Sequence, residues 1–168
     1  MDFTLEKWDN SFLESFISAC SDPHLADHMC ETLPYPMDTA FAAEYIRERM
    51  FNNEERQLCR AVIINDQLVG GSDVVFGSGV FQKNAELSLW IAKDFRGQGL
   101  GSRVISEMCR LCFDCCDIIR IEARPYSGHF EARAALEKAG FLHEGTMHKA
   151  IFNNNKIYDY DIYALIKE

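Results

Sequence analysis

Apolar side chains recur every three or four residues in four stretches of the chain, as they do along one face of an amphipathic helix. Three of the four stretches have a residue type that favours a helix boundary, either a side chain that caps the first turn or a glycine that stops the last. The first predicted helix begins after Asp9 or Asn10, and the second runs from Asp38 or Thr39 to Asn52-Asn53. The third begins after Gly101, and the fourth spans Glu131–Ala139.

Between and after these helices the pattern changes to extended runs that are rich in β-branched and aromatic residues. Turn-forming residues such as Asn65-Asp66 and Asn153-Asn154-Asn155 separate neighbouring runs. Hairpins and helix-linked strands together predict a mixed sheet in an α/β domain of two or three layers. The predicted strands are Cys59–Ile64, Leu68–Phe76, Ala85–Ile91, Ile118–Ala123, Phe141–Phe152 and Ile157–Ile166.

Composition narrows the class of protein. A chain of 168 residues without a Pro/Ser-rich linker or an internal repeat is expected to form one domain, residues 1–168. The formal net charge of −9 argues against nucleic acid as a partner and favours a cationic substrate such as an amine. The acidic start and the short apolar runs predict neither a signal peptide nor a membrane helix. Because the seven cysteines are an odd number and four of them are clustered, we expect a reducing, cytoplasmic location.

One glycine-rich segment carries recognisable chemistry. Arg96-Gly97-Gln98-Gly99-Leu100-Gly101-Ser102 lies between a predicted strand and a predicted helix. Glycines expose successive backbone N–H groups, and a helix N-terminus favours an anion, so this turn is a candidate phosphate site with Arg96 as a cation at its rim. A P-loop is excluded because no lysine follows the last glycine. A dinucleotide site with Glu122 as the ribose ligand and a tight turn without a ligand both stay open.

Several segments together resemble the GNAT N-acetyltransferases. Residues 96–101 are similar to their R/Q-x-x-G-x-G/A signature, and residues 135–145 (ALEKAGFLHEG) resemble a segment of the Rim-type branch, the ribosomal-protein alanine N-acetyltransferases. Leu33-Pro34-Tyr35-Pro36, Ala85-Glu86-Leu87 and residues 159–165 resemble the same branch, in the same order. The resemblance implies a mixed, mostly antiparallel sheet of about six to seven strands flanked by about four helices, with acetyl-CoA as co-substrate.

The resemblance also assigns cofactor contacts. The backbone of Trp90, Ile91 and Ala92 should pair with the pantetheine arm of acetyl-CoA. His129 and Ala132 replace an Asn and a Ser of the family, so His129 becomes the candidate for the contact that the Asn makes with this arm. Leu136 occupies the place where other branches have a tyrosine acid, and leucine is usual in the Rim-type branch. The turn that should hold the pyrophosphate consists of Arg96, Gly97, Gln98, Gly99, Leu100, Gly101 and Ser102.

The candidate catalytic residues flank the expected position of the thioester. Glu86 is the candidate base, directly or through water, although an exposed strand position without a catalytic role is the alternative. Tyr126 and His129 follow the Ile118–Ala123 strand and are candidate acids, with loop packing and helix capping as the alternatives. Tyr35, Glu86 and Asp159 are candidate contacts to the amine acceptor, and Asp159 also fits a hairpin-end carboxylate in water.

Neither of two groups of metal-ligand residue types predicts a metal. Cys109, Cys112 and Cys116 share one face of a predicted helix, where cysteine packs as a small apolar side chain. His24 and His28 are four residues apart without a third ligand, so we expect them at the surface or in a substrate groove.

The sequence therefore predicts an acetyl-CoA-dependent N-acetyltransferase that acts on a primary amine, either a protein N-terminus or a small molecule, in a ternary complex. A CoA- or nucleotide-binding sensor without turnover is the first alternative, and an NAD-dependent oxidoreductase is the second. Nucleic acid and membranes are not expected as partners, and a homodimer is common among domains of this kind.

Overall fold

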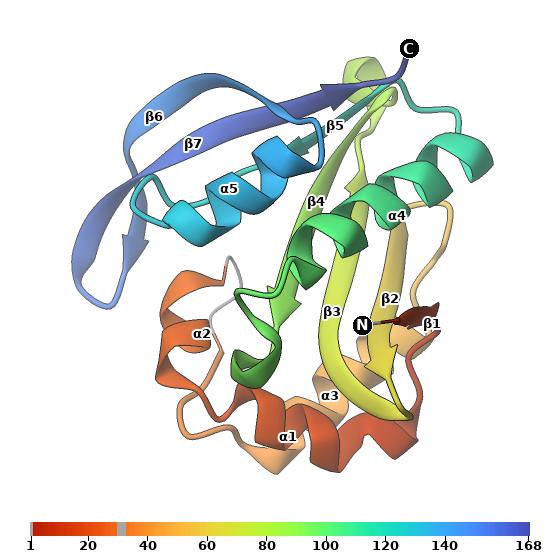
Figure 1. Cartoon of the computed structure of the whole chain (residues 1–168), viewed down its shortest axis with the longest axis vertical. Helices are drawn as coiled ribbons and strands as arrows, with labels where there is room; N and C mark the ends of the chain where they lie inside the picture. Colours follow the sequence, from red (N-terminus) through yellow and green to blue (C-terminus); the bar gives the residue numbers. More distant parts are fainter. Residues whose placement is uncertain (1, 30–32) are drawn as a thin grey trace.

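A computed structural model of the 168-residue chain describes residues 2–29 and 33–168, with the backbone alone at residues 26–28. A seven-stranded sheet has the order β1-β2-β3-β4-β5-β7-β6 (Figure 1). Neighbouring strands are antiparallel except for β4 and β5, which are parallel. The expected mixed, mostly antiparallel sheet is thereby confirmed. The strands are β1 (Thr4–Glu6), β2 (Gln57–Ile64), β3 (Gln67–Phe76), β4 (Asn84–Ile91), β5 (Arg120–Ala123), β6 (Leu142–Asn153) and β7 (Lys156–Ile166).

Five α-helices accompany the sheet in the described part of the chain, and their boundaries follow local capping chemistry. The Asp38 carboxylate accepts from the Ala40 N–H at the start of α3, as the sequence predicts. Asp22 caps α2 in the same way, and Pro23 occupies its first position, where a missing N–H costs nothing. The helices are α1 (Leu13–Cys20), α2 (Pro23–His28), α3 (Thr39–Met50), α4 (Leu100–Cys115) and α5 (Phe130–Lys138).

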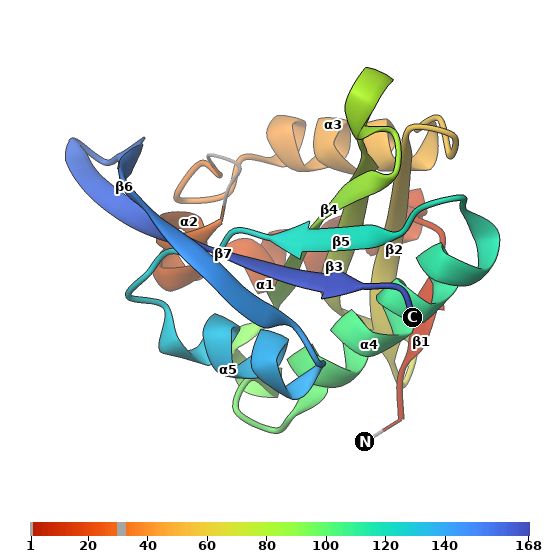
Figure 2. The same cartoon turned by 90° about the horizontal axis from the view of Figure 1, so that it is seen from above.

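The helices form two layers around the sheet. In Figure 2, α3 lies on one side of the strands, and α4 and α5 lie on the other. The core beneath α1 and α3 is aromatic, since Phe16 stacks on Tyr45 and meets the rings of Trp8 and Trp90 edge-on. The core beneath α4 and α5 is mainly aliphatic. The sequence allows a domain of two or of three layers. Because apolar side chains are buried on both faces of the sheet, the domain has three layers.

Two elements differ from the sequence-based prediction. β1 covers three residues, which is too short for an alternating pattern to be recognised, yet it pairs along β2. α2 is a separate six-residue helix in addition to the four helices that the hydrophobic pattern predicts. None of the helices in the described part of the chain combines the length and the apolar character that a membrane span requires.

Candidate active site

A cavity of about 460 Å³ passes through the sheet at the point where β4 and β5 separate. Its lining includes Tyr45 and Arg49 from α3 and Ala135 and Leu136 from α5. Because α3 and α5 cover opposite faces of the sheet, the cavity is lined from both faces. Its volume lies within the range of about 300–1,000 Å³ that is usual for small-molecule sites.

One edge of β4 borders this cavity with its backbone. The Ala92 N–H donates to Val69 and the Gly77 N–H donates to Asn84, so every second residue of β4 directs its N–H and C=O groups toward β3. The intervening residues direct theirs to the other side, where β5 pairs only with residues 84–86. In the described part of the chain, no strand pairs with the edge beyond that point. The backbone groups of this edge belong to Leu87, Leu89 and Ile91.

This alternation corrects the expected contacts with the cofactor arm. Of the three residues predicted for this contact, only Ile91 directs its backbone groups into the cavity. Trp90 and Ala92 direct theirs toward β3, although the side chain of Trp90 still lines the cavity. Leu87 and Leu89 were missed because the direction of a backbone group depends on the pairing register, which the sequence motif does not contain.

The glycine turn leads directly into α4. Gly97 and Gly99 have φ values of 72° and 76°, a region that side chains with a Cβ rarely adopt. Gly99 is the N-cap of α4 and supplies no side-chain cap, so the first N–H groups of this 16-residue helix stay available to a ligand. The Ser102 hydroxyl is buried and donates back to the Gly99 carbonyl at 3.0 Å. Gly97, Gly99, Gly101 and Ser102 all line the cavity.

Arg96 connects this turn to α2. Its Nε donates to the Ile91 carbonyl at 2.7 Å, and its Nη1 lies 2.8 Å from the Asp22 carboxylate that caps α2. The guanidinium thus fixes the end of β4 to the start of α2 in this structure. The sequence predicted a cation at the phosphate rim and gave no indication of this pairing with Asp22.

A lysine that the sequence analysis missed completes the rim of the turn. The Lys138 Nζ lies 3.5 Å from the position that a Cβ on Gly99 would take, and Lys138 lines the cavity. It reaches the turn because the end of α5 packs beside the start of α4. The resembling segment at residues 135–145 contained this lysine, but only the tertiary packing shows its position.

Glu86 lies where β4 leaves β5, as expected for a residue beside the thioester. Its carboxylate is 3.2 Å from the Arg124 guanidinium, and a second carboxylate, Glu122, lies 2.6 Å from the same guanidinium. Glu86 and Arg124 both line the cavity and are partly open to solvent. Glu86 is therefore placed to contact a ligand, and the Arg124 guanidinium holds its carboxylate in position.

A buried ion pair forms the α3 end of the cavity. Arg49 and Asp73 are 2.7 Å apart, with 5% and 8% of their side chains exposed, and the guanidinium lies over the Tyr45 ring. Both residues line the cavity. Burial, reinforced by the negative charge of Asp73, raises the pKa of the adjacent Cys59 thiol, so this thiol stays protonated. The sequence analysis did not identify Asp73, because a carboxylate in the middle of a strand has no local signature.

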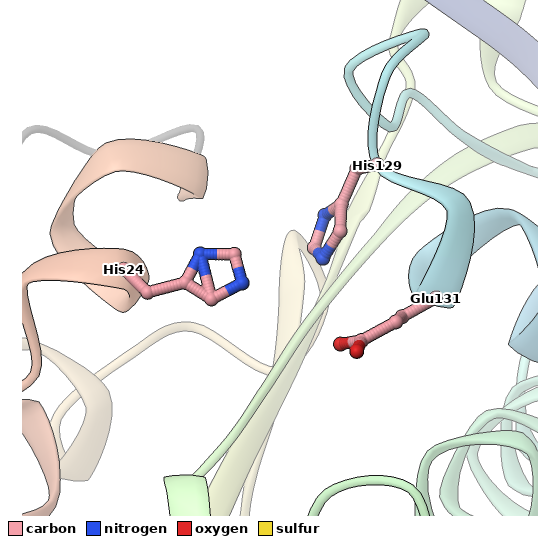
Figure 3. Close-up of side chains that lie close together, drawn as sticks. All are labelled: His24, His129 and Glu131. Atoms are coloured by element: carbon pink, nitrogen blue, oxygen red, sulfur yellow. The ribbon is translucent and has the colours of Figure 1, made fainter.

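Three side chains from two distant parts of the chain meet at another part of the cavity wall. Figure 3 shows His24 on α2 directed toward His129 and Glu131 at the start of α5. One ligand-type atom from each lies within 4.8 Å of the others, and the two imidazole rings are 5.8 Å apart. His24 therefore belongs to the groove, as predicted, and meets two further ligand-type residues that its own neighbourhood in the sequence lacks. The side chain of His28 lies outside the described residues.

Six predicted site residues do not line the cavity, namely Tyr35, Ala92, Gln98, Leu100, Tyr126 and Asp159, and of these Leu100 is buried in the core. Tyr126 is buried, bridges to β7 and accepts from Asn153, which fits its alternative role in packing. Tyr35 is exposed, and the Gln98 amide donates to a backbone carbonyl within its own turn. Asp159 accepts from the Lys149 N–H and contacts His148 on the hairpin, and these interactions lower the pKa of its carboxyl group.

The clustered thiols pack as the sequence predicts. Cys109 and Cys112 are buried in the core beneath α4, where burial raises the pKa of each thiol to about 12. Cys116 is partly buried at the end of the same helix, and Cys115 is exposed.

A sheet that opens between two parallel strands, with a glycine turn at the head of the next helix, identifies the class of protein. Residues 2–142 match the family described as Acetyltransferase (GNAT) domain, and the chain belongs to this family.

Particular relatives support this assignment. The chain is 29% identical to "Putative ribosomal N-acetyltransferase YdaF" of Bacillus subtilis (strain 168) over 85 residues, 51% of this chain and 46% of the relative. It spans about half the length of the curated relatives it matches.

Solved structures share the whole fold. The structure of RimL, a ribosomal L7/L12 alpha-N-protein acetyltransferase in complex with coenzyme A, superposes with a TM-score of 0.87 at 16% identity, covering 98% of this chain and 94% of that one. Microcin C7 self immunity acetyltransferase MccE, in complex with acetyl-CoA and AMP, gives 0.86 at 19% identity, covering 98% and 92%.

Proposed function

We propose that this chain transfers the acetyl group of acetyl-CoA directly to a primary amine in a ternary complex. The observation that carries the proposal is the cavity at the point where β4 and β5 separate, which is lined by residues from both faces of the sheet. A cofactor and an acceptor that enter from opposite faces can meet there without an acyl-enzyme intermediate. The GNAT family match supports acetyl transfer as the reaction.

The cofactor binds to what we call the cofactor wall, residues 96–102 together with the free edge of β4 at residues 87–91. The N–H groups at the start of α4 and the Lys138 ammonium favour the negatively charged pyrophosphate. The free C=O groups of Leu87 and Leu89 and the free N–H group of Ile91 pair with the amide-containing pantetheine arm as a strand would, while the Ile91 carbonyl already accepts from Arg96. His129, at the start of α5, is the proposed side-chain contact with the arm.

The acceptor binds to what we call the acceptor wall, which consists of Arg49, Asp73, Glu86 and Arg124. Each of its two carboxylates is paired with a guanidinium, and Glu86 is the one that is partly open to solvent, so Glu86 is the carboxylate that a cationic amine can reach. Glu86, acting through water, takes a proton from the ammonium group so that the neutral nitrogen can attack the thioester carbonyl. The Leu89 N–H group, which the cofactor arm leaves unused, is placed to stabilise the resulting oxyanion. As the C–S bond breaks, His129 donates a proton to the thiolate and takes up the second proton that the attacking nitrogen loses, so that CoA and an N-acetyl amine leave.

An N-terminal amine of a ribosomal protein is the acceptor that we propose to test first. The sequence resemblance and the names of YdaF and RimL favour this class. We also propose that residues 1–168 act as one cytoplasmic domain that does not bind nucleic acid or a membrane. We propose further that the chain forms a homodimer, and light scattering measures the molar mass that tests this.

The deciding experiment combines binding with product analysis. The chain is heated with acetyl-CoA, CoA or NAD in parallel, since a ligand at 100 times its Kd stabilises a fold by about 2.7 kcal/mol. The same samples are incubated with N-terminal peptides and polyamines, and acetylated products are detected by mass spectrometry. We expect stabilisation by acetyl-CoA and CoA together with an acetylated amine. Stabilisation without any product would favour a sensor, and stabilisation by NAD alone would favour an oxidoreductase.

A further inference from the structure

His24, His129 and Glu131 form a group in the cavity wall of which the proposed function uses only His129. Two imidazoles and one carboxylate are a ligand set that Zn²⁺ and related divalent transition metals accept in proteins. The three groups come from two separate elements, with His24 on α2 and the other two at the start of α5. Figure 3 shows all three side chains directed toward one shared space.

The geometry requires only side-chain adjustment to hold an ion. The ligand-type atoms lie within 4.8 Å of one another, whereas ligands of a tetrahedral zinc ion with bonds of about 2.0–2.1 Å are about 3.3 Å apart. His24 and Glu131 are exposed and His129 is partly buried, so rotation about their side-chain bonds can bring the donor atoms together. Three protein ligands leave one position of a tetrahedral ion open to water.

We propose that His24, His129 and Glu131 form a binding site for a divalent transition metal of the zinc type, which, when occupied, links α2 to α5 across the cavity and competes with acetyl-CoA. All three residues line the same cavity as the glycine turn. The competition rests on the proposed function, because it requires the cofactor arm to pass His129. The proposed transfer itself needs no metal, so the bound ion acts as an inhibitor. Because linkage is reciprocal, acetyl-CoA must weaken zinc binding by the factor by which zinc weakens acetyl-CoA binding.

Zinc binding is measured first, without any acetyl-CoA, by calorimetric titration of ZnCl₂ into the full chain in a buffer that does not chelate metals. We expect one zinc per chain, and a loss of affinity of more than about tenfold in His24→Ala and in Glu131→Gln, since removal of even an outer ligand partner costs about 10–100-fold. His148→Ala is the matched control, because His148 is an exposed histidine on β6 outside the cavity. Cys115→Ser controls for binding by an exposed thiol.

Three results would overturn the site. They are zinc binding that survives in both His24→Ala and Glu131→Gln, loss of zinc binding in Cys115→Ser, and no binding to the wild type at micromolar zinc. Near-ultraviolet absorption of the Co²⁺-loaded chain gives a second test, because thiolate ligands add charge-transfer bands there that imidazole and carboxylate ligands do not, and such bands would contradict the site. Thermal unfolding of each variant without metal shows whether it is folded.

Competition is measured afterwards, by titrating acetyl-CoA with and without saturating zinc. We expect the apparent Kd of acetyl-CoA to rise with zinc in the wild type and to stay constant in His24→Ala. An unchanged Kd in the wild type would contradict the competition. If acetyl-CoA does not bind at all, the proposed function fails, while the zinc titration still decides the metal site.

Discussion

The cofactor wall and the acceptor wall border the same cavity but are built in different ways. The cofactor wall is nearly continuous in sequence, and it presents mostly backbone groups along a strand edge and a turn. The acceptor wall consists of one charged side chain from each of α3, β3 and β4 and a fourth from the residue after β5. These four side chains are spread over 76 positions of the sequence, from Arg49 to Arg124. A site made of backbone groups from neighbouring residues forms when that short segment has the right conformation. A site made of side chains from distant elements forms only when the whole chain is folded. The two walls should therefore respond differently to substitution.

The largest expected effect is on catalysis at the acceptor wall. Removing the proposed base with Glu86→Gln should lower kcat by about 10²–10⁴-fold, which is the usual contribution of a placed proton acceptor. The Kd of acetyl-CoA should stay the same, because Glu86 does not belong to the cofactor wall. Steady-state kinetics and calorimetry measure the two quantities, with Glu107→Gln on the exposed face of α4 as the control. A kcat equal to that of the control would exclude Glu86 as the base.

The next effect is on stability. Arg49→Met leaves the Asp73 carboxylate buried without its ion-pair partner, which should lower the free energy of unfolding by about 3–5 kcal/mol. Arg110→Met removes a guanidinium from exposed pairs with Glu107 and Asp114 and should cost less than about 1 kcal/mol. Urea unfolding of both variants makes the comparison. Equal losses would mean that solvent reaches the Arg49 pair as freely as it reaches the surface pairs.

The cofactor wall should be sensitive to backbone conformation at one glycine and tolerant at another. Gly99 has a positive φ, so Gly99→Val should distort the turn and weaken acetyl-CoA binding by at least about tenfold, or about 1.4 kcal/mol. An added Cβ at Gly101 meets its nearest neighbours at 3.7 Å, an ordinary contact, so Gly101→Ala should leave the Kd nearly unchanged. Calorimetry with acetyl-CoA separates the two variants. A comparable loss in both would show that the cofactor itself packs against Gly101.

The smallest effect concerns the thiols beneath the two helical layers. Burial raises the pKa of Cys20 on one face and of Cys109 on the other to about 12, so neither should react with a thiol reagent in the native state. Cys115 is exposed and should react quickly. The rapid phase of labelling should therefore shrink in Cys115→Ser and remain in Cys20→Ser and Cys109→Ser. Loss of the rapid phase in Cys20→Ser would mean that the core beneath α1 and α3 opens to solvent.

The same contrast explains what the sequence could and could not predict. The turn around Gly99 and the cap at Asp38 follow from local conformational preferences, and both have the predicted conformation. Trp90 and Ala92 were assigned backbone contacts that the pairing of β4 with β3 excludes. Lys138 was missed because only packing between helices brings it to the turn.

Side-chain sites were the least predictable part. Asp159 was expected beside the acceptor, but the β6–β7 hairpin places its carboxylate beside His148 and the Lys149 N–H. His24 and Glu131 are separated by more than a hundred residues, and no spacing in the sequence indicates that they meet. Tertiary contacts between charged groups depend on crossing angles and register, which a periodic pattern leaves undetermined.

The parting of β4 and β5 has a mechanical consequence. Three residue pairs form the ladder between these strands, so the block of β1 to β4 and the block of β5 to β7 are joined through a short seam. A ligand whose amides form hydrogen bonds with the free edge of β4, and whose other side packs on α5, would lengthen the connection between the two blocks. The sheet would then be completed by its own cofactor, and amide hydrogen exchange in both blocks should slow together when acetyl-CoA binds.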